Sequence, residues 1–304
     1  MTIVVAGYSG LVGSAIYELL TSRNEEVVGI NSEVVNLLDR QATFDFIKDQ
    51  KPDIVIDAAA IVGGIGANNS FPVDFLSKNL QIQNNLMDAS HAANVERFVF
   101  LGSSCIYPRE CPQPIKEEYL LNGPLEPTNS AYAIAKIAGI ELIKSYRKQF
   151  GRRWISLMPT NMYGPMDNFD LDTCHVLPAF INRFVSAKKS GAKEVLLWGT
   201  GVPKREFLHS RDLASAVLFA LEKYDSDLHL NVGVGTDISI KDLAEMVSAI
   251  AGFEGAIAWD HSKPDGTPRK MLDVSRIKSM GWNPAIPLES GIRETVRWFE
   301  ANYN

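Results

Sequence analysis

A tyrosine and a lysine stand four residues apart in the stretch SAYAIAKIAG, as Tyr132 and Lys136. On a helix, this spacing brings both side chains to one face. A phenol with a pKa near ~10 is a poor acid or base at neutral pH. A neighbouring ammonium and an oxidised nicotinamide ring both favour the phenolate and move that pKa toward the working range. Ser103 ends an apolar run and can hydrogen-bond the same carbonyl oxygen. The three residues predict acid–base chemistry at a carbonyl group, although a Tyr-x-x-x-Lys pair also occurs on solvated helix faces.

One of the three cysteines stands two residues beyond Ser103, in the stretch GSSCIYP. A thiol at that place, Cys105, is either a second acid–base group or a small buried side chain. Cys111 and Cys174 carry no motif, and we expect them to be inert. An odd number of scattered cysteines is typical of free thiols in a reducing cytoplasm.

A glycine-rich turn near the start of the chain predicts a nucleotide-binding site. Gly7, Gly10 and Gly13 follow the apolar run TIVVA and stand at the head of an amphipathic stretch. Glycines permit a tight turn and let a pyrophosphate approach the backbone N–H groups at a helix N-terminus. The alternative is a tight turn in an α/β domain that binds no cofactor. The strand–turn–helix context favours a dinucleotide.

The residues that follow the second predicted strand bear on the choice of coenzyme. A carboxylate about 20 residues beyond the glycines favours NAD, and a nearby basic residue favours NADP. This chain has Asn31, Ser32 and Glu33 there, with Glu33 past the expected position and no lysine or arginine close by. These residues leave the coenzyme open.

β-Branched runs alternate with amphipathic stretches through the first half of the chain. The predicted strands are Thr2–Ala6, Glu26–Ile30, Asp53–Ala59, Arg97–Ser103 and Trp154–Thr160, and the predicted helices are Leu11–Ser22, Gln41–Asp49, Val73–Ala93 and Ser130–Gln149. Strands that alternate with helices pair in parallel through right-handed crossovers. The fold class is therefore predicted to be α/β, a doubly wound parallel (Rossmann) sheet with a smaller C-terminal substrate lobe.

The second half is less regular, with two plain helices predicted at Ser239–Ala251 and Ser290–Asn302, and Arg183 expected on a helix eight residues after His175. We expect a dinucleotide-binding domain over residues 1–165, to which residues 204–235 return. Residues 166–203 and 236–304 then form mainly a substrate-binding lobe over the carboxyl ends of the strands, where open α/β sheets bind ligands.

Composition limits the class of protein. The net charge of -6 argues against nucleic-acid binding, which needs a basic surface. No apolar run approaches the ~18 residues of a membrane span, and no signal peptide is evident. No histidine or cysteine pair has metal-ligand spacing. We expect a soluble cytoplasmic protein without a metal, and the histidines His91, His229 and His261 to be structural.

The chain resembles the extended short-chain dehydrogenase/reductases, enzymes of nucleotide sugars, and among them the GDP-L-fucose synthase family. The first resemblance rests on the three glycines, Ser103, Tyr132 and Lys136. The second rests on longer motifs that run from the first strand to the last helix, such as GSSCIYP, EPTN, YAIAKIAGI, HVLPA and SKPDGTPRKMLDV. It implies NADPH-dependent 3,5-epimerisation and 4-reduction of GDP-4-keto-6-deoxy-D-mannose to GDP-L-fucose, and a homodimer.

The resemblance also implies residue roles. Epimerisation beside a ketone removes a proton from one face of a carbon and returns one to the other face. The resemblance gives these two roles to Cys105 and His175, with Ser103 and Tyr132 on the enolate oxygen. It gives substrate contact to Arg183, Trp198, Arg205, Asp265 and Lys270. The expected coenzyme contacts are Gly7, Tyr8, Ser9, Gly10, Leu11, Val12, Gly13, Ser32, Asn36, Leu37, Leu101, Gly102, Ser103, Ser104, Lys136, Pro159, Thr160, Asn161, Met162 and His175.

Two positions depart from the family pattern. Arginines that hold the 2′-phosphate of NADP in the family are replaced here by Ser9 and Ser32. NADP is the expected coenzyme, NAD is the alternative, and Arg40 is a candidate substitute for the lost cations. Two other functions stay open, namely an epimerase/reductase or reductase of a related GDP-keto-sugar such as a GDP-6-deoxyheptose, and a non-catalytic dinucleotide sensor.

Overall fold

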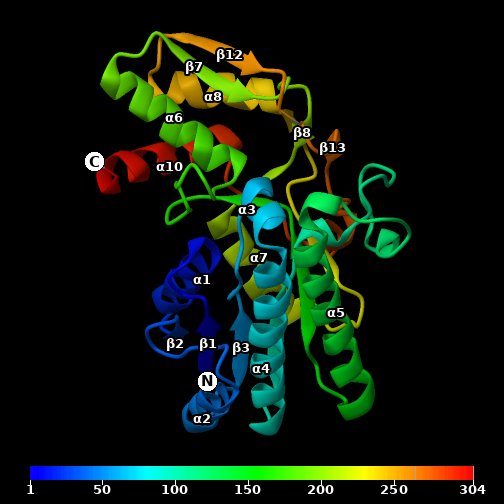
Figure 1. Cartoon of the computed structure of the whole chain (residues 1–304). Helices are drawn as coiled ribbons and strands as arrows, with labels where there is room; N and C mark the ends of the chain where they lie inside the picture. The colour runs from blue at the N-terminus through cyan, green and yellow to red at the C-terminus, as the bar shows by residue number, and fades with distance from the viewer. Residues whose placement is uncertain (264, 304) are drawn as a thin grey trace.

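The computed structural model describes residues 1–263 and 265–303 (Figure 1). A central sheet of six parallel strands has the order β10-β5-β4-β3-β1-β2. Its strands are β1 (Thr2–Ala6), β2 (Glu26–Ile30), β3 (Ile54–Asp57), β4 (Arg97–Leu101), β5 (Ile155–Pro159) and β10 (Leu230–Val232). The predicted doubly wound parallel sheet is confirmed.

Helices cover both faces of the sheet. On one face, α1 (Leu11–Ser22) packs against α7 (Ser210–Lys223); on the other lie α2 (Arg40–Gln50), α4 (Asn79–Ala92) and α5 (Ser130–Phe150). The chain runs outward from β1 to β2 and then returns past β1 to β3, and right-handed crossovers therefore place α1 and α2 on opposite faces. The strand order reverses between β1 and β3, and ligands bind at the carboxyl ends of strands at such a point.

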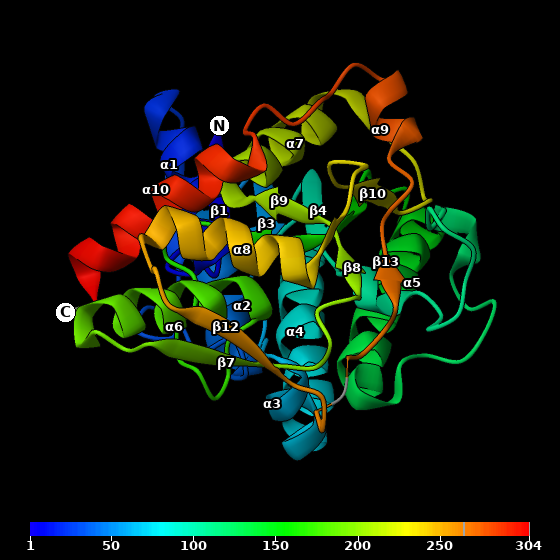
Figure 2. The same cartoon turned by 90° about the horizontal axis from the view of Figure 1, so that it is seen from above.

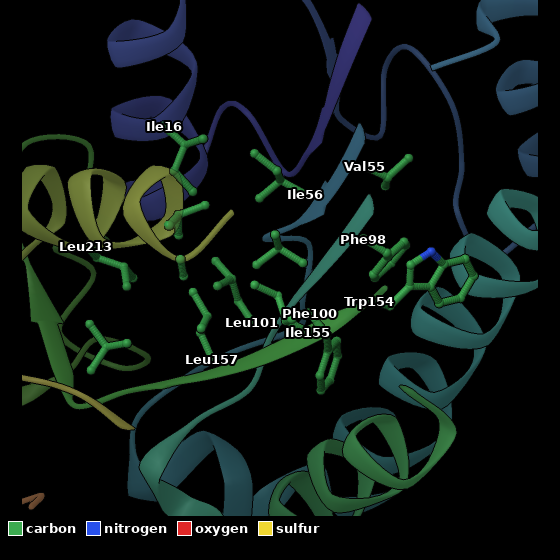
Figure 3. Close-up of a cluster of buried hydrophobic side chains, with 14 of the residues drawn as sticks. Ile16, Val55, Ile56, Phe98, Phe100, Leu101, Trp154, Ile155, Leu157 and Leu213 are labelled. Atoms are coloured by element: carbon green, nitrogen blue, oxygen red, sulfur yellow. The ribbon is translucent and has the colours of Figure 1, made fainter. Parts of the chain in front are cut away.

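The core of this part lies between the sheet and its helices. Figure 3 shows Ile16 and Leu213, from α1 and α7, and the aromatic side chains of Phe98, Phe100 and Trp154 among the buried residues. All five are almost completely buried. Strands buried on both faces read as continuous apolar runs, which is why the strands were recognisable in the sequence.

A second buried cluster lies above the carboxyl ends of the strands (Figures 1 and 2). It joins α6 (Val176–Ser190), α8 (Ile240–Ala251) and α10 (Leu288–Asn302) to a parallel pair of strands, β7 (Glu194–Trp198) and β12 (Ala256–Asp260). The helices at α8 and α10 were predicted to within two residues. The chain thus has two cores, while the predicted residue limits of the two domains stay a prediction.

The remaining described elements are short. They are α3 (Ile65–Ser70), the π-helical turn η1 (Asp74–Lys78), the 3-10 turns η2 (Ser104–Ile106), η3 (Glu117–Tyr119) and η4 (Pro127–Asn129), the paired strands β6 (Asn161–Tyr163) and β9 (Phe207–His209), the small sheet of β8 (Lys204–Arg205), β11 (Ile238–Ser239) and β13 (Arg269–Lys270), and α9 (Ser275–Ser279). The single helix predicted over Val73–Ala93 is therefore wrong in its first turn, which is π-helical. None of the described helices is both long enough and apolar enough to cross a membrane.

Candidate functional site

The glycine loop closes tightly between β1 and α1. Gly7 has a φ of +80°, and a Cβ atom on Gly13 would lie 2.0 Å from the carbonyl oxygen of Gly7. Both positions therefore require glycine. Gly10 is the N-cap of α1, and no side chain of the described residues caps it. The first N–H groups of α1, on Leu11, Val12 and Gly13, are thus left for an anionic group.

The expected coenzyme residues around the second strand form the outer side of this loop. The ring of Tyr8 lies against Tyr17 and over Gly29, where a Cβ atom would be 2.4 Å from the ring. Ser9 and Ser32 are exposed. Asn36 accepts a hydrogen bond from the N–H of Leu38, and Leu37 is buried.

Arg40, the candidate substitute for the missing arginines, is engaged away from the glycine loop. Its guanidinium is 2.7 Å from a carboxylate oxygen of Asp88 and lies over the ring of Phe44. In this structure, the cation is held between α2 and α4.

The remaining expected coenzyme residues lie at the carboxyl ends of β4 and β5. Gly102 donates its N–H to the carbonyl oxygen of Leu157, and Lys136 donates from Nζ to the carbonyl oxygen of Leu101 at 2.9 Å. Thr160 and Asn161, between Pro159 and Met162, both donate from their side chains to the carbonyl oxygen of Glu206. The residues of one sheet edge are thus placed to fit a dinucleotide that begins at the glycine loop.

Tyr132 and Lys136 lie on the first two turns of α5, beside Ser103 at the end of β4. The Nζ atom of Lys136 is 5.9 Å from the centre of the Tyr132 ring. Burial raises the pKa of the Tyr132 phenol well above its usual range, the neighbouring Cys105 and Asp57 raise it further, and the Ser103 hydroxyl lowers it. Burial lowers the pKa of Lys136, against the attraction of Asp57. The phenol therefore holds its proton, as a group that protonates an oxygen must.

Cys105 lies beside these residues on the turn η2. The Ser103 hydroxyl oxygen accepts a hydrogen bond from the N–H of Cys105, which fixes the start of this turn. The sulfur of Cys105 accepts two hydrogen bonds, from Nδ2 of Asn129 and from Nζ of Lys270, each at 3.4 Å. A small cavity of about 30 Å³ adjoins the sulfur, and Glu126 is also in its wall. An ammonium and an amide N–H together stabilise a thiolate.

His175 is the N-cap residue of α6 and stands open to solvent at the edge of the same region. Surrounding protein atoms nevertheless desolvate its imidazole, which lowers the pKa of His175. The Lys270 ammonium lowers this pKa further, because it repels a second positive charge. The segment before it is fixed by the N–H of Gly64, which donates to the carbonyl oxygen of Thr173. Lys270 therefore acts electrostatically on both Cys105 and His175.

The residues expected to bind substrate are only partly brought together. Lys270 and Arg205 are register partners in neighbouring strands, and burial lowers the pKa of Arg205 while Cys105 and Asp265 raise it. Asp265 accepts hydrogen bonds from the N–H and hydroxyl of Thr200, and Trp198 is 63% exposed. Arg183, on α6, has no direct contact with this group among the interactions of the described residues.

Sequence reasoning missed two side chains at this site. Asn129, in the motif EPTN, donates from its side-chain amide to the sulfur of Cys105. The Oδ1 atom of the same amide is buried without a hydrogen-bond partner in the described part of the chain. Asp57, at the end of β3, is buried within reach of the charge of Lys136. A carboxylate directly after the apolar run Ile54–Ile56 was the available signal, whereas nothing in the local sequence paired Asn129 with Cys105.

Comparison with known proteins decides the family. Residues 3–233 match the model of the NAD dependent epimerase/dehydratase family. The chain belongs to this family. It is 52% identical over 302 residues to a probable GDP-L-fucose synthase 1 of Oryza sativa subsp. japonica, which covers 99% of this chain and 92% of the rice chain. It is 46% identical over 310 residues to the GDP-L-fucose synthase of Escherichia coli K12, covering 99% and 97%.

A solved structure supports the same placement in the family. The GDP-mannoheptose C4 reductase from Campylobacter jejuni, with NADP bound, superposes with a TM-score of 0.91 at 36% identity and covers 98% of each chain. The resemblance predicted from the motifs is confirmed at the level of the family. The roles of individual site residues stay predictions.

Proposed function

We propose that this chain converts GDP-4-keto-6-deoxy-D-mannose and NADPH to GDP-L-fucose, by epimerisation at C3 and C5 and reduction at C4. Relatives of about half-identical sequence over the whole chain carry the name GDP-L-fucose synthase. The observation that carries the proposal is that Cys105, with two donors on its sulfur, lies beside Ser103, Tyr132 and Lys136. A reductase needs only the latter three residues, and a dinucleotide sensor needs none of them.

The residues support epimerisation in the following way. The Cys105 thiolate, held by Lys270 and Asn129, removes the proton next to the C4 ketone. Ser103 and Tyr132 donate hydrogen bonds to the enolate oxygen that forms. His175 returns a proton to the opposite face of the carbon. Since the diphosphate of the substrate is negatively charged, it offsets the repulsion between Lys270 and His175 and favours the protonated imidazole that this step needs.

Reduction uses the same oxygen site. NADPH supplies the hydride for C4 when it is bound. Tyr132 then donates its proton to O4, Ser103 holds that oxygen, and the Lys136 ammonium stabilises the phenolate that remains. The first N–H groups of α1 would hold the coenzyme pyrophosphate, and the carboxyl ends of β4 and β5 would hold its nicotinamide half.

Basic residues of β8, β13 and α6 suit a GDP-sugar. Arg205 and Lys270 lie together and can bind the diphosphate, with Arg183 closing on it from α6. Trp198, with its largely exposed ring, can cover a ring of the substrate. We further propose a homodimer in the cytoplasm, as the family resemblance implies.

A second candidate is reduction of a GDP-heptose, because a C4 reductase of GDP-mannoheptose superposes over nearly the whole chain. The test is NMR analysis of the product formed with NADPH from GDP-4-keto-6-deoxymannose, and separately from the corresponding GDP-4-keto-heptose. The proposal expects GDP-L-fucose and a higher kcat/KM for the hexose. An unchanged hexose would overturn it, and faster turnover of the heptose would favour the second candidate.

A further inference from the structure

A carboxyl group lies in the core at the end of β3, where the mechanism above does not use it. Asp57 is 0% exposed. Its Oδ1 atom accepts a hydrogen bond from the N–H of Ala59 at 3.1 Å, and its Oδ2 atom has no hydrogen-bond partner among the described residues. An ionised carboxylate in such surroundings is costly unless a positive charge compensates it.

The nearest candidate charge is that of Lys136, which is itself only 3% exposed. Its Nζ atom donates to the carbonyl oxygen of Leu101 and lies 4.7 Å from the centre of the Phe100 ring. An ammonium has three N–H groups, and this one has a single hydrogen-bond acceptor in the described part of the chain. A buried ammonium is as costly as a buried carboxylate unless it is compensated.

Strand register brings the two groups to the same face of the sheet. Asp57 is the partner of Phe100 in the parallel pair of β3 and β4, and such partners point to the same face about 4.8 Å apart. Helix α5 packs on that face, because a Cβ atom on Gly139 would touch the Phe100 ring at 2.3 Å. Lys136 lies on α5, one turn before Gly139.

The charges around the pair are few. Tyr132 faces it from α5, and both Asp57 and Cys105, the latter from η2, raise the pKa of this phenol. The pKa of Asp57 is raised to about 6, because the effect of burial exceeds the lowering by Lys136 and by the N–H of Ala59. Asp57 is therefore ionised above pH 7 and reciprocally favours the protonated form of Lys136.

We propose that Asp57 is a positioning residue of the reductase site, the buried counter-ion that keeps Lys136 protonated beside Tyr132. The electrostatic influence of Asp57 and Lys136 on each other does not depend on the reaction proposed above, while its catalytic consequence rests on that proposed function. As the pH rises, Lys136 loses its proton and with it the stabilisation of the Tyr132 phenolate. With Asp57 ionised, this loss occurs at higher pH.

The first test needs no substrate. The free energy of unfolding is measured for wild type, Asp57→Asn, Lys136→Met and the double variant, at pH 8 and pH 5. At pH 8, we expect Asp57→Asn to lower the free energy of unfolding more when residue 136 is lysine than when it is methionine. This coupling should disappear at pH 5, where Asp57 is protonated. Additive effects at pH 8, or equal coupling at both pH values, would overturn the proposal. Should Asp57→Asn alone fail to fold, folding of the double variant supports the pairing and its failure opposes it.

The second test follows NADPH oxidation with the keto sugar against pH. In Asp57→Asn, the alkaline limb should move to lower pH by roughly one unit, whereas Asp49→Asn, which changes an exposed carboxylate of α2, should leave it in place. An unmoved limb in Asp57→Asn would contradict the catalytic role. If wild type has no activity on any GDP-keto-sugar, the proposed function fails, and the unfolding measurements still decide whether Asp57 and Lys136 are energetically coupled.

Discussion

The ammonium nitrogen of Lys270 lies 3.4 Å from the sulfur of Cys105, although the two residues are 165 positions apart in the chain. The contact joins β13 to the turn that follows β4 of the main sheet. It therefore couples the part of the molecule expected to bind the diphosphate to the group expected to remove a proton from the sugar. Substitution of either residue should affect epimerisation more than reduction.

Lys270→Met should slow deuterium exchange at C3 and C5 of the keto sugar. The thiolate loses a charge-assisted hydrogen bond worth roughly 1.5–3 kcal/mol, which is about a tenfold to hundredfold effect. The measurement is NMR of exchange in heavy water at saturating substrate, so that weaker binding does not obscure the chemical step. Lys48→Met, on the exposed face of α2, is the control. Exchange at the wild-type rate in Lys270→Met would remove this lysine from the chemistry.

Tyr132→Phe should lose most of the reduction and keep coenzyme binding. The ring and its contact with Phe75 are retained, and only the proton donor for O4 is removed. General acid–base groups contribute typically 10²–10⁴-fold. The measurements are kcat for NADPH oxidation and the Kd of NADPH. Activity within threefold of wild type would place the proton donor elsewhere.

Wild type should discriminate only weakly between NADPH and NADH. Ser9 and Ser32 stand where charge-assisted contacts to the 2′-phosphate are expected, and each such contact is worth roughly 1.5–3 kcal/mol. Arg40 is paired with Asp88 instead. The ratio of kcat/KM values for the two coenzymes should therefore rise when Ser9 and Ser32 are both replaced by arginine. A wild-type preference of several thousand-fold would show that other cations hold the phosphate.

Asp167→Asn should alter how stability depends on pH. The Asp167 carboxyl is buried before α6, and burial raises its pKa from 3.8 to about 7. Between these values the folded state binds more protons than the unfolded state, so wild type loses stability as the pH rises. Asparagine does not titrate. The free energy of unfolding of the variant relative to wild type should therefore increase by roughly 2–3 kcal/mol from pH 5 to pH 8. A difference that is independent of pH would mean that Asp167 titrates normally.

Much of the sheet could be predicted from the sequence because its signals are local. The apolar runs at β1 and β2 and the glycines before α1 gave the bounds that the structure has. The strand pair of the second core could not be predicted in this way. Strands β7 and β12 alternate in burial or are half-exposed, and they pair across about sixty residues of chain, so neither carries a strong signal alone.

The site was predictable in part for the same reason. Tyr132 and Lys136 are one helical turn apart, so local spacing predicts that they share a face. Cys105 is only two residues beyond Ser103, but its role was predicted from the family resemblance. Asn129 meets Cys105 through tertiary packing of η4 on η2, which local sequence does not reveal. Asp57 was overlooked because an isolated carboxylate in an apolar strand is read as part of the strand until its buried partner is seen.

The most direct test of the account is deuterium exchange into the keto sugar by wild type, Cys105→Ser and His175→Asn, because it separates the two reactions. Without reduced coenzyme, wild type should exchange both C3 and C5 in heavy water. Cys105→Ser should exchange little, because a serine hydroxyl is a far weaker base than a thiol with a pKa near ~8.5. With NADPH, it should still slowly reduce the ketone to a GDP-6-deoxyhexose of unchanged C3 and C5 configuration. His175→Asn should exchange more than Cys105→Ser yet give little inverted product. Exchange at the wild-type rate in Cys105→Ser would contradict the account, because Cys105 would then be structural and the base another residue.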